Sequence, residues 1–158
     1  MSFESNGWKL LFTEEMQALY DKLVQESDAI LASTHDVHHP KIKFRRRVDS
    51  IIFEEVPQDP GKPAYRQGNT LGSDARHWCR AKFNGRFRLF FWYNSESKSI
   101  VYAWLNDENT LRKAGAESDP YVVFCKMLDR GNPPNSWEEL IAACEQNKKA
   151  AKPTKPSK

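Results

Sequence analysis

Three runs in the middle of this 158-residue chain have the pattern of β-strands, and they constrain the fold more than any other feature. The runs cover residues 77–83, 87–94 and 99–105, and they are separated by Asn84-Gly85-Arg86 and by the polar segment 95–98. Connections this short join neighbouring antiparallel strands. The sequence therefore predicts a small antiparallel β-meander.

Side chains alternate between the two faces of a strand, so odd and even positions predict the two faces of this sheet. The odd positions are apolar and predict a face that packs on helices: Cys79, Ala81, Phe83, Phe87, Leu89, Phe91, Tyr93, Val101, Ala103 and Leu105. The even positions mix cations with large rings: Trp78, Arg80, Lys82, Arg88, Phe90, Trp92, Ile100, Tyr102 and Trp104.

The turn between the first two runs decides whether these faces stay separate. A two-residue turn at Asn84-Gly85 would mix apolar and charged residues on both faces. A three-residue loop over 84–86, or a bulge, instead places Lys82 directly opposite Arg88. Facing like charges cost stability and are found where an anion binds, so we expect an anion-binding position there.

Helical patterns flank the three runs. Thr13, Asp119 and Ser136 are suitable N-caps, and Pro40 and Pro120 suit the first turn of a helix. The expected helices cover residues 13–31, 40–57 and 119–131, with a short one from Ser136. Together these elements predict an α+β fold with two N-terminal helices packed on the meander and further helices at the C-terminal end.

Charge is segregated along the chain. Residues 41–95 contain twelve basic and five acidic side chains, whereas residues 1–40 contain two and seven. A basic middle segment predicts a local anionic partner; random clustering on a solvated surface is the alternative. We expect one domain over residues 1–146 and a disordered, Lys-rich tail over 147–158, because that tail has nothing to bury.

Several classes of protein are excluded by what the chain lacks. The longest apolar run, residues 89–93, is too short to cross a membrane, and no secretory signal precedes it. Three scattered cysteines favour neither disulfides nor a zinc site, so we expect a cytoplasmic protein without a metal or other cofactor. His35, His38 and His39 are more typical of a loop than of a metal site.

The even face suits RNA, because guanidinium and ammonium groups bind phosphates and aromatic rings stack on unpaired bases. Two alternatives to RNA binding remain open. In the first, the aromatic residues form a second core under a later helix; these residues are Phe90, Trp92, Tyr102 and Trp104. In the second, Arg80, Lys82 and Arg88 are ordinary solvated strand residues. The basic stretch Lys41–Arg47 contacts a nucleic-acid backbone or is the solvated side of its helix.

Seven segments resemble a known family, and the most specific is Asn106-Asp-Glu-Asn-Thr-Leu-Arg112. The others are Asn6–Trp8, Pro63–Arg66, Thr70–Ser73, Trp78–Phe83, Gly85–Phe91 and Lys126–Pro134. Over nearly its whole length the chain is similar to the YhaV-type toxins of bacterial type II toxin–antitoxin systems, which belong to the RelE-like superfamily. The resemblance implies a RelE/ParE-like fold, with helices on one face of the sheet and RNA on the other.

The resemblance implies an endoribonuclease, or mRNA interferase, that cleaves RNA without a metal and so inhibits translation and growth. In this reaction a 2′-hydroxyl attacks the neighbouring phosphate and leaves a 2′,3′-cyclic phosphate. The implied roles are deprotonation by Lys82, charge stabilisation by Arg80 and Arg88, and assistance of the leaving oxygen by Arg112.

Tyr121 is the fifth implied catalytic residue, although it lies on an apolar stripe where a core tyrosine is equally expected. The loop after the third strand is longer than in RelE, which makes Lys113 the alternative to Arg112. We expect the RNA-binding residues to be Arg86, Trp92, Tyr102, Trp104 and Lys113.

The resemblance also implies partners. These are an antitoxin with an AbrB-type DNA-binding domain, mRNA that is free or on the ribosome, and operator DNA bound only through the toxin–antitoxin complex. Two other functions stay open: a non-catalytic RNA- or ribosome-binding translation inhibitor, and a subunit whose aromatic face another chain covers.

Overall fold

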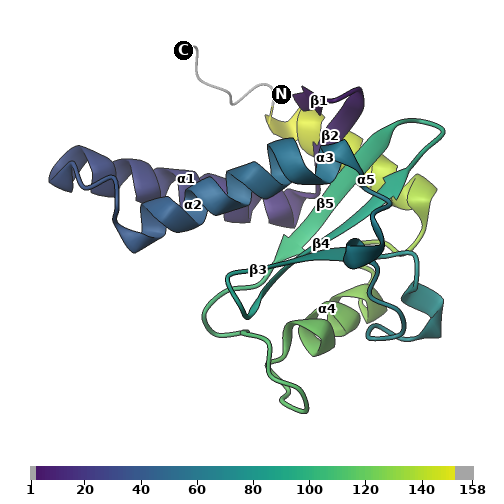
Figure 1. Ribbon diagram of the computed structural model, residues 1–158. Helices are drawn as coiled ribbons and strands as arrows, with labels where there is room; N and C mark the ends of the chain where they lie inside the picture. The colour runs from purple at the N-terminus through teal and green to yellow at the C-terminus, as the bar shows by residue number, and fades with distance from the viewer. Residues whose placement is uncertain (1–2, 152–158) are drawn as a thin grey trace.

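The computed structural model describes residues 3–151, and their side chains up to Gln146. The fold is α+β, with one five-stranded sheet in the order β1-β2-β5-β4-β3 (Figure 1). The strands are β1 (Phe3–Ser5), β2 (Trp8–Phe12), β3 (Cys79–Phe83), β4 (Phe87–Asn94) and β5 (Ser99–Leu105). The helices are α1 (Glu14–Thr34), α2 (Pro40–Ser50), α3 (Val56–Gln58), α4 (Pro120–Asp129) and α5 (Trp137–Ala151).

The meander β3-β4-β5 is confirmed, but it is only part of a mixed sheet. A hairpin of β1 and β2 adds to it, and β2 runs parallel to β5. Asn6 and Gly7 form the hairpin turn with φ values of 51° and 82°, the left-handed conformation that two-residue hairpins require. The predicted antiparallel meander is therefore correct but incomplete, because the whole sheet is mixed and includes a hairpin that was not predicted.

Helices α1 and α4 begin at the predicted caps Thr13 and Asp119, and α2 begins at the predicted Pro40 with His39 as a cap that was not predicted. The Thr13 hydroxyl accepts a hydrogen bond from the Met16 N–H, and His39 caps α2 through its Nδ1, which accepts from the Lys41 N–H. From α2 the chain passes through a π-helix, η1 (Ile51–Glu55), into α3. Helix α5 continues to Ala151, so the backbone is helical in the first five residues of the predicted tail. Residues 152–158 lie outside the described residues, and the division of the chain at residue 146 stays a prediction.

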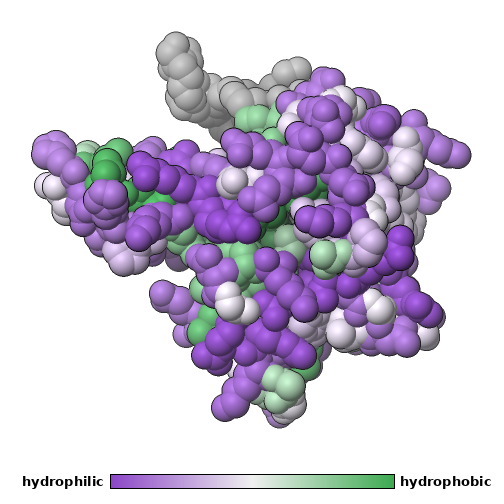
Figure 2. Space-filling view, in the orientation of Figure 1, coloured by the Kyte–Doolittle hydropathy of each residue, from purple (hydrophilic) through white to green (hydrophobic). Residues whose placement is uncertain are grey.

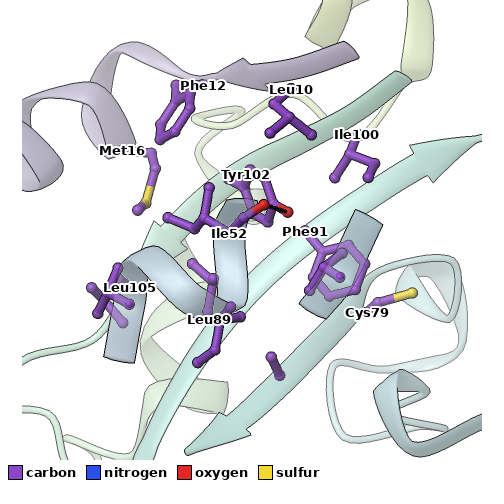
Figure 3. Packing of buried hydrophobic residues seen from close by; sticks show 14 of the residues in the cluster. Leu10, Phe12, Met16, Ile52, Cys79, Leu89, Phe91, Ile100, Tyr102 and Leu105 are labelled. Carbon is purple, nitrogen blue, oxygen red and sulfur yellow. Dashed lines mark hydrogen bonds between the residues drawn. The ribbon is translucent and has the colours of Figure 1, made fainter. Parts of the chain in front are cut away.

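Two apolar cores cover the two faces of the sheet. The first joins the sheet to α1, α2 and η1, and Figure 3 shows Met16, Ile52, Leu89 and Phe91 within it. The second joins the opposite face to α4 and α5 and is built on Trp78, Phe90, Trp104, Phe124 and Leu140. In Figure 1 the paired helices α1 and α2 and the helix α4 accordingly lie on opposite sides of the sheet.

A β-bulge changes the expected faces of β5. Phe90 pairs with Trp104 but Phe91 pairs with Tyr102, which leaves Ala103 as an extra residue. Tyr102 consequently points into the first core, where it is fully buried and its hydroxyl donates to the Ile52 carbonyl at 2.7 Å. The prediction that Tyr102 lies on the RNA-facing side is wrong, because one extra residue reverses the faces of the residues beyond it.

The even-face aromatics form the second core rather than an open stacking surface. Phe90 stacks on Phe124 with ring centroids 4.4 Å apart, and Trp104 lies 6.2 Å from the same ring. Trp92 is half-buried against Trp78 and Trp137. The expectation that Trp104 is free to stack on bases is corrected, because large rings gain most from leaving water. The alternative of a second core is confirmed for Phe90, Trp92 and Trp104 but not for Tyr102, and the RNA-binding role of the half-buried Trp92 stays a prediction.

The α1–α2 hairpin extends beyond the sheet, and its tip exposes Leu31 and Val37. Figure 2 shows a mainly hydrophilic face with apolar residues at this tip and in the groove beneath the hairpin. That groove has a volume of about 990 Å³, and Leu23, Phe44 and Leu105 line it. Within the described residues, no helix is both long enough and apolar enough to cross a membrane.

Candidate functional site

The turn between β3 and β4 has the predicted register. Phe83 pairs with Phe87 and Lys82 pairs with Arg88, which leaves Asn84, Gly85 and Arg86 as a three-residue loop. Asn84 and Gly85 both adopt positive φ, a conformation that asparagine and glycine tolerate best. Lys82 is exposed, whereas Arg88 is only 7% exposed, so two cations face each other at the end of the sheet.

Tyr121 joins the two buried arginines of the sheet. Its hydroxyl accepts hydrogen bonds from Arg80 Nε at 2.8 Å and from Arg88 Nε at 3.2 Å. Arg80 also donates from Nη1 to the carbonyls of Ala64 and Arg66. Arg88 donates from Nη1 to the carbonyls of Gly85 and Phe87. Backbone acceptors therefore hold both guanidinium groups in place.

These contacts leave hydrogen-bond donors for a ligand. A tyrosine hydroxyl has two acceptor positions and one hydrogen. Both acceptor positions of Tyr121 are used, and its hydrogen has no acceptor among the described residues. The Nη2 atoms of Arg80 and Arg88 also have no hydrogen-bond partner among the described residues. In the described part of the chain, every buried side-chain nitrogen or oxygen has a partner, so these Nη2 atoms are not buried and reach solvent. The Nη2 groups of Arg80 and Arg88 can therefore donate to an anion.

Arg112 reaches the same place in spite of the long loop before it. Its guanidinium lies 4.8 Å from the centre of the Tyr121 ring, and its Nη1 donates to Asp119 Oδ1 at 2.9 Å. The loop is fixed by two bonds to Arg86, since the Arg112 N–H donates to the Arg86 carbonyl and Arg86 Nε donates to the Arg112 carbonyl. Lys113 is exposed at the rim. Of these two candidates, Arg112 is the one that contacts Tyr121.

Asp119 and Asn106 support the site and were not assigned to it from the sequence. Asp119 is the predicted N-cap of α4, but its carboxylate also accepts from Arg112 and from the Lys113 N–H. Asn106 accepts from the Arg88 N–H at 2.7 Å and donates to the carbonyls of Arg86 and Thr110. Their signal was a short polar side chain next to a buried strand or helix end, where backbone groups need partners.

We call Arg80, Lys82, Arg88, Arg112 and Tyr121 the cationic cluster; Arg86 and Lys113 lie exposed at its rim. Asp119 is the one carboxylate that bonds to the cluster within the described part of the chain. Burial raises the pKa of the neighbouring Cys79 thiol to about 11, so this thiol is protonated at neutral pH and is not a nucleophile. Among the described residues, no three His, Cys, Asp or Glu side chains are placed to hold a metal ion together.

An α+β domain with fixed guanidinium groups and a tyrosine hydroxyl at the end of its sheet defines a class of proteins that bind a phosphate group by charge-assisted hydrogen bonds. Comparison with known proteins is more specific. Residues 8–145 match the family model of the YhaV toxins, described as a toxin with endonuclease activity, of a toxin–antitoxin system. The chain belongs to this family, and it is therefore an endonuclease toxin of a toxin–antitoxin system.

Curated relatives agree with the family match. The chain is 42% identical over 146 residues to "Toxin YhaV" of Escherichia coli O6:H1, a match that covers 90% of this chain and 95% of the relative. It is 41% identical over 145 residues to "Ribonuclease toxin YhaV" of Escherichia coli strain K12, covering 89% of this chain and 94% of that protein. The comparison with solved structures finds no match.

Proposed function

We propose that this toxin is an endoribonuclease, an mRNA interferase, that cuts RNA at the cationic cluster and thereby inhibits translation and growth. One observation carries the proposal: a single hydroxyl, that of Tyr121, accepts hydrogen bonds from both Arg80 and Arg88, with Arg112 packed on its ring. Such a group of donors fits the phosphate of a nucleic-acid backbone. The name of the strain K12 relative, a ribonuclease toxin, supports RNA as that nucleic acid.

The proposed reaction is attack by an RNA 2′-oxygen on the adjacent phosphorus. The P–O5′ bond breaks, which leaves a 2′,3′-cyclic phosphate on one product and a 5′-hydroxyl on the other. Lys82, exposed opposite Arg88, accepts the 2′-hydroxyl proton in its neutral form. Arg80, Arg88 and the Tyr121 hydroxyl stabilise the charge of the phosphorane. Arg112 stabilises the leaving oxygen by its charge alone, since a guanidinium does not release a proton near neutral pH. Solvent water supplies the proton that converts the departing 5′-oxygen into the 5′-hydroxyl.

We extend the proposal to the fold family and the partners. The arrangement of α1 and α2 on one face of the sheet, with the cluster at the end of the other, supports membership of the RelE-like superfamily. Membership of a toxin–antitoxin family supports a cognate antitoxin, and we propose one of the AbrB type that forms a hetero-oligomer and binds operator DNA. The proposed site of action is mRNA in the bacterial cytoplasm.

Lys82 offers the cleanest test, because it is exposed and its removal leaves no buried group unpaired. The free toxin is incubated with single-stranded RNA in excess EDTA, alongside Lys82→Met and the matched control Lys22→Met on α1. We expect 2′,3′-cyclic ends from the wild type and the control, and a rate about 10² to 10⁴ times lower for Lys82→Met. If the wild type cuts neither free RNA nor mRNA on translating ribosomes, the proposal is wrong.

A further inference from the structure

A cavity beside the cationic cluster is not used by the proposed reaction. It lies at the start of β3, has a volume of about 410 Å³, and is lined by Arg66, Arg76, His77, Cys79 and residues 92–96. From Cys79 to Lys82 the chain advances three residues along one strand, about 10 Å. Arg80 connects the two places directly, because its Nη1 donates to the Arg66 carbonyl at 2.8 Å.

The cavity has a surplus of available positive charge. Arg66 and Arg76 are both exposed, and neither forms an ion pair with another described residue. Glu96 is the one acidic residue of the lining. Two guanidinium groups without a carboxylate partner retain their donors for an anion, and phosphate is the anion that they fit best.

An aromatic side chain is fixed next to these charges. His77 is exposed, and its ring packs on Trp92 with centroids 4.1 Å apart. Its Nε2 lies 2.6 Å from Asn135 Oδ1, which also accepts from Trp78 Nε1. The ring is therefore held by contacts on one side while it lines the cavity. A fixed ring beside unpaired cations is the arrangement that binds single-stranded nucleic acid, with the base on the ring and the backbone on the cations.

We propose that this cavity binds one nucleotide of the RNA substrate outside the bond that is cut, with its base on His77 and its phosphate on Arg66 and Arg76. The inference rests on the proposed ribonuclease function and adds a second contact region to it. The cavity then contributes to affinity for RNA longer than the two nucleotides that flank the scissile phosphate.

Binding is tested with a single-stranded RNA decamer that carries 2′-O-methyl groups and is not cut, by fluorescence anisotropy at several salt concentrations. The variant is Arg66→Gln/Arg76→Gln, and the matched control is Lys9→Gln/Arg46→Gln, which removes two exposed charges on β2 and α2. We expect the variant to bind at least 10-fold more weakly than the control. Its slope of log affinity against log salt should be smaller by about 0.7, since the single phosphate held by the two arginines contributes about 0.7 on a single strand.

The ring is tested separately. His77→Ala should weaken binding of the decamer about 5-fold or more, whereas His77→Phe, which keeps a ring but not the bond to Asn135, should retain the wild-type affinity. Equal losses in both variants would show that His77 acts by its hydrogen bond and not by stacking, and this result would overturn the base-binding role.

Cleavage of a dinucleotide separates this inference from the proposed function. The Arg66→Gln/Arg76→Gln variant should cut the dinucleotide like the wild type, while its kcat/KM for an unmodified decamer falls at least 10-fold.

If the variant binds and cuts the decamer like the control, the cavity is not an RNA site although the ribonuclease function stands. If the wild type cuts no RNA, the proposed function is wrong and the anisotropy still decides the cavity. Normal RNA binding with lost antitoxin binding would assign the cavity to a protein.

Discussion

Asp119 shows how one carboxylate can start a helix and position a member of the cationic cluster. It accepts from the Tyr121 N–H as the N-cap of α4, and from Arg112 Nη1 and the Lys113 N–H as part of the site. Its side chain is only 2% exposed, so the ion pair with Arg112 is screened weakly by water. The position of Arg112 therefore depends on Oδ1 of the same carboxylate whose Oδ2 caps the start of α4.

Asp119→Asn should separate these two roles. Asparagine caps helices about as well as aspartate, so the fold should persist. The charged partner of Arg112 is lost, and because a hydrogen bond between charged groups contributes about 1.5–3 kcal/mol, we expect turnover of RNA to fall about 10- to 100-fold. Single-turnover cleavage at saturating RNA measures this effect.

Arg112→Gln provides the matched comparison for that variant. If Asp119 acts through Arg112, the double variant Asp119→Asn/Arg112→Gln should be no slower than Arg112→Gln alone. Fully additive losses would contradict a positioning role for Asp119. Thermal unfolding of all three variants shows whether a loss of cleavage is merely a loss of folded protein.

At the scale of elements, Tyr102 ties β5 to the π-helix η1. Its hydroxyl donates to the Ile52 carbonyl at 2.7 Å inside the first core. Tyr102→Phe leaves that buried carbonyl without its partner, which costs about 1–3 kcal/mol. We expect the free energy of unfolding in urea to fall by this amount at neutral pH, while cleavage per folded molecule stays unchanged because Tyr102 lies away from the cluster.

The same residue gives a pH dependence. Burial raises the pKa of Tyr102 well above its ordinary value. In the unfolded chain it ionises near pH 10, so the stabilisation is fully present below about pH 10 and is lost as the pH rises above it. Between pH 9 and 11.5 the wild type should lose stability more steeply than Tyr102→Phe, by up to about 1.4 kcal/mol per pH unit. Parallel curves would show that the hydroxyl ionises freely in the folded protein.

Asn106 connects three elements of the site in a similar way. It accepts from the Arg88 N–H at the start of β4 and donates to carbonyls of the β3–β4 loop and of the loop that carries Arg112. Asn106→Ala leaves the buried Arg88 N–H without its acceptor, so we expect a loss of about 1–3 kcal/mol in stability. Turnover should fall as well, since Arg88 and Arg112 lose a common support. Urea unfolding and cleavage by the same preparation test both, and an unchanged rate would contradict the second expectation.

At the scale of the whole molecule, helices cover both faces of the sheet, and the proposed RNA site therefore lies at its end. Core residues occupy the centre of each face, so the exposed cations Lys82, Arg86 and Lys113 gather around the point where β3, β4 and α4 meet. Exposed charges bind RNA largely by releasing its counterions. Affinity for uncut RNA should therefore fall steeply as salt is raised.

Replacing these three cations by glutamine should lower the salt slope by about 2, at about 0.7 for each phosphate contact on a single strand. The control replaces Lys9, Lys22 and Arg46, which are equally exposed but lie on β2, α1 and α2. The same change in slope for both triple variants would mean that net charge, rather than this location, governs RNA binding.

The features that the sequence determined by itself are local. Thr13, Asp119 and the prolines at the starts of α2 and α4 define helix starts, because caps and φ restrictions act within a few residues. The register that places Lys82 opposite Arg88 follows from one turn and the alternation on either side of it. Arg80, Lys82 and Arg88 could be selected for the same reason.

Tertiary structure decided what depends on packing between distant segments. The bulge at Ala103 reverses the faces of Ile100 to Tyr102, yet both orientations present apolar side chains and so leave the same pattern. Whether Trp104 faces RNA or a core depends on α4, which begins sixteen residues later and covers it. Tyr121 and Arg112 reach Arg80 and Arg88 only because α4 folds back over the sheet. The free energy that drives this folding comes from burying aromatic rings against one another, and these contacts join segments far apart in the sequence.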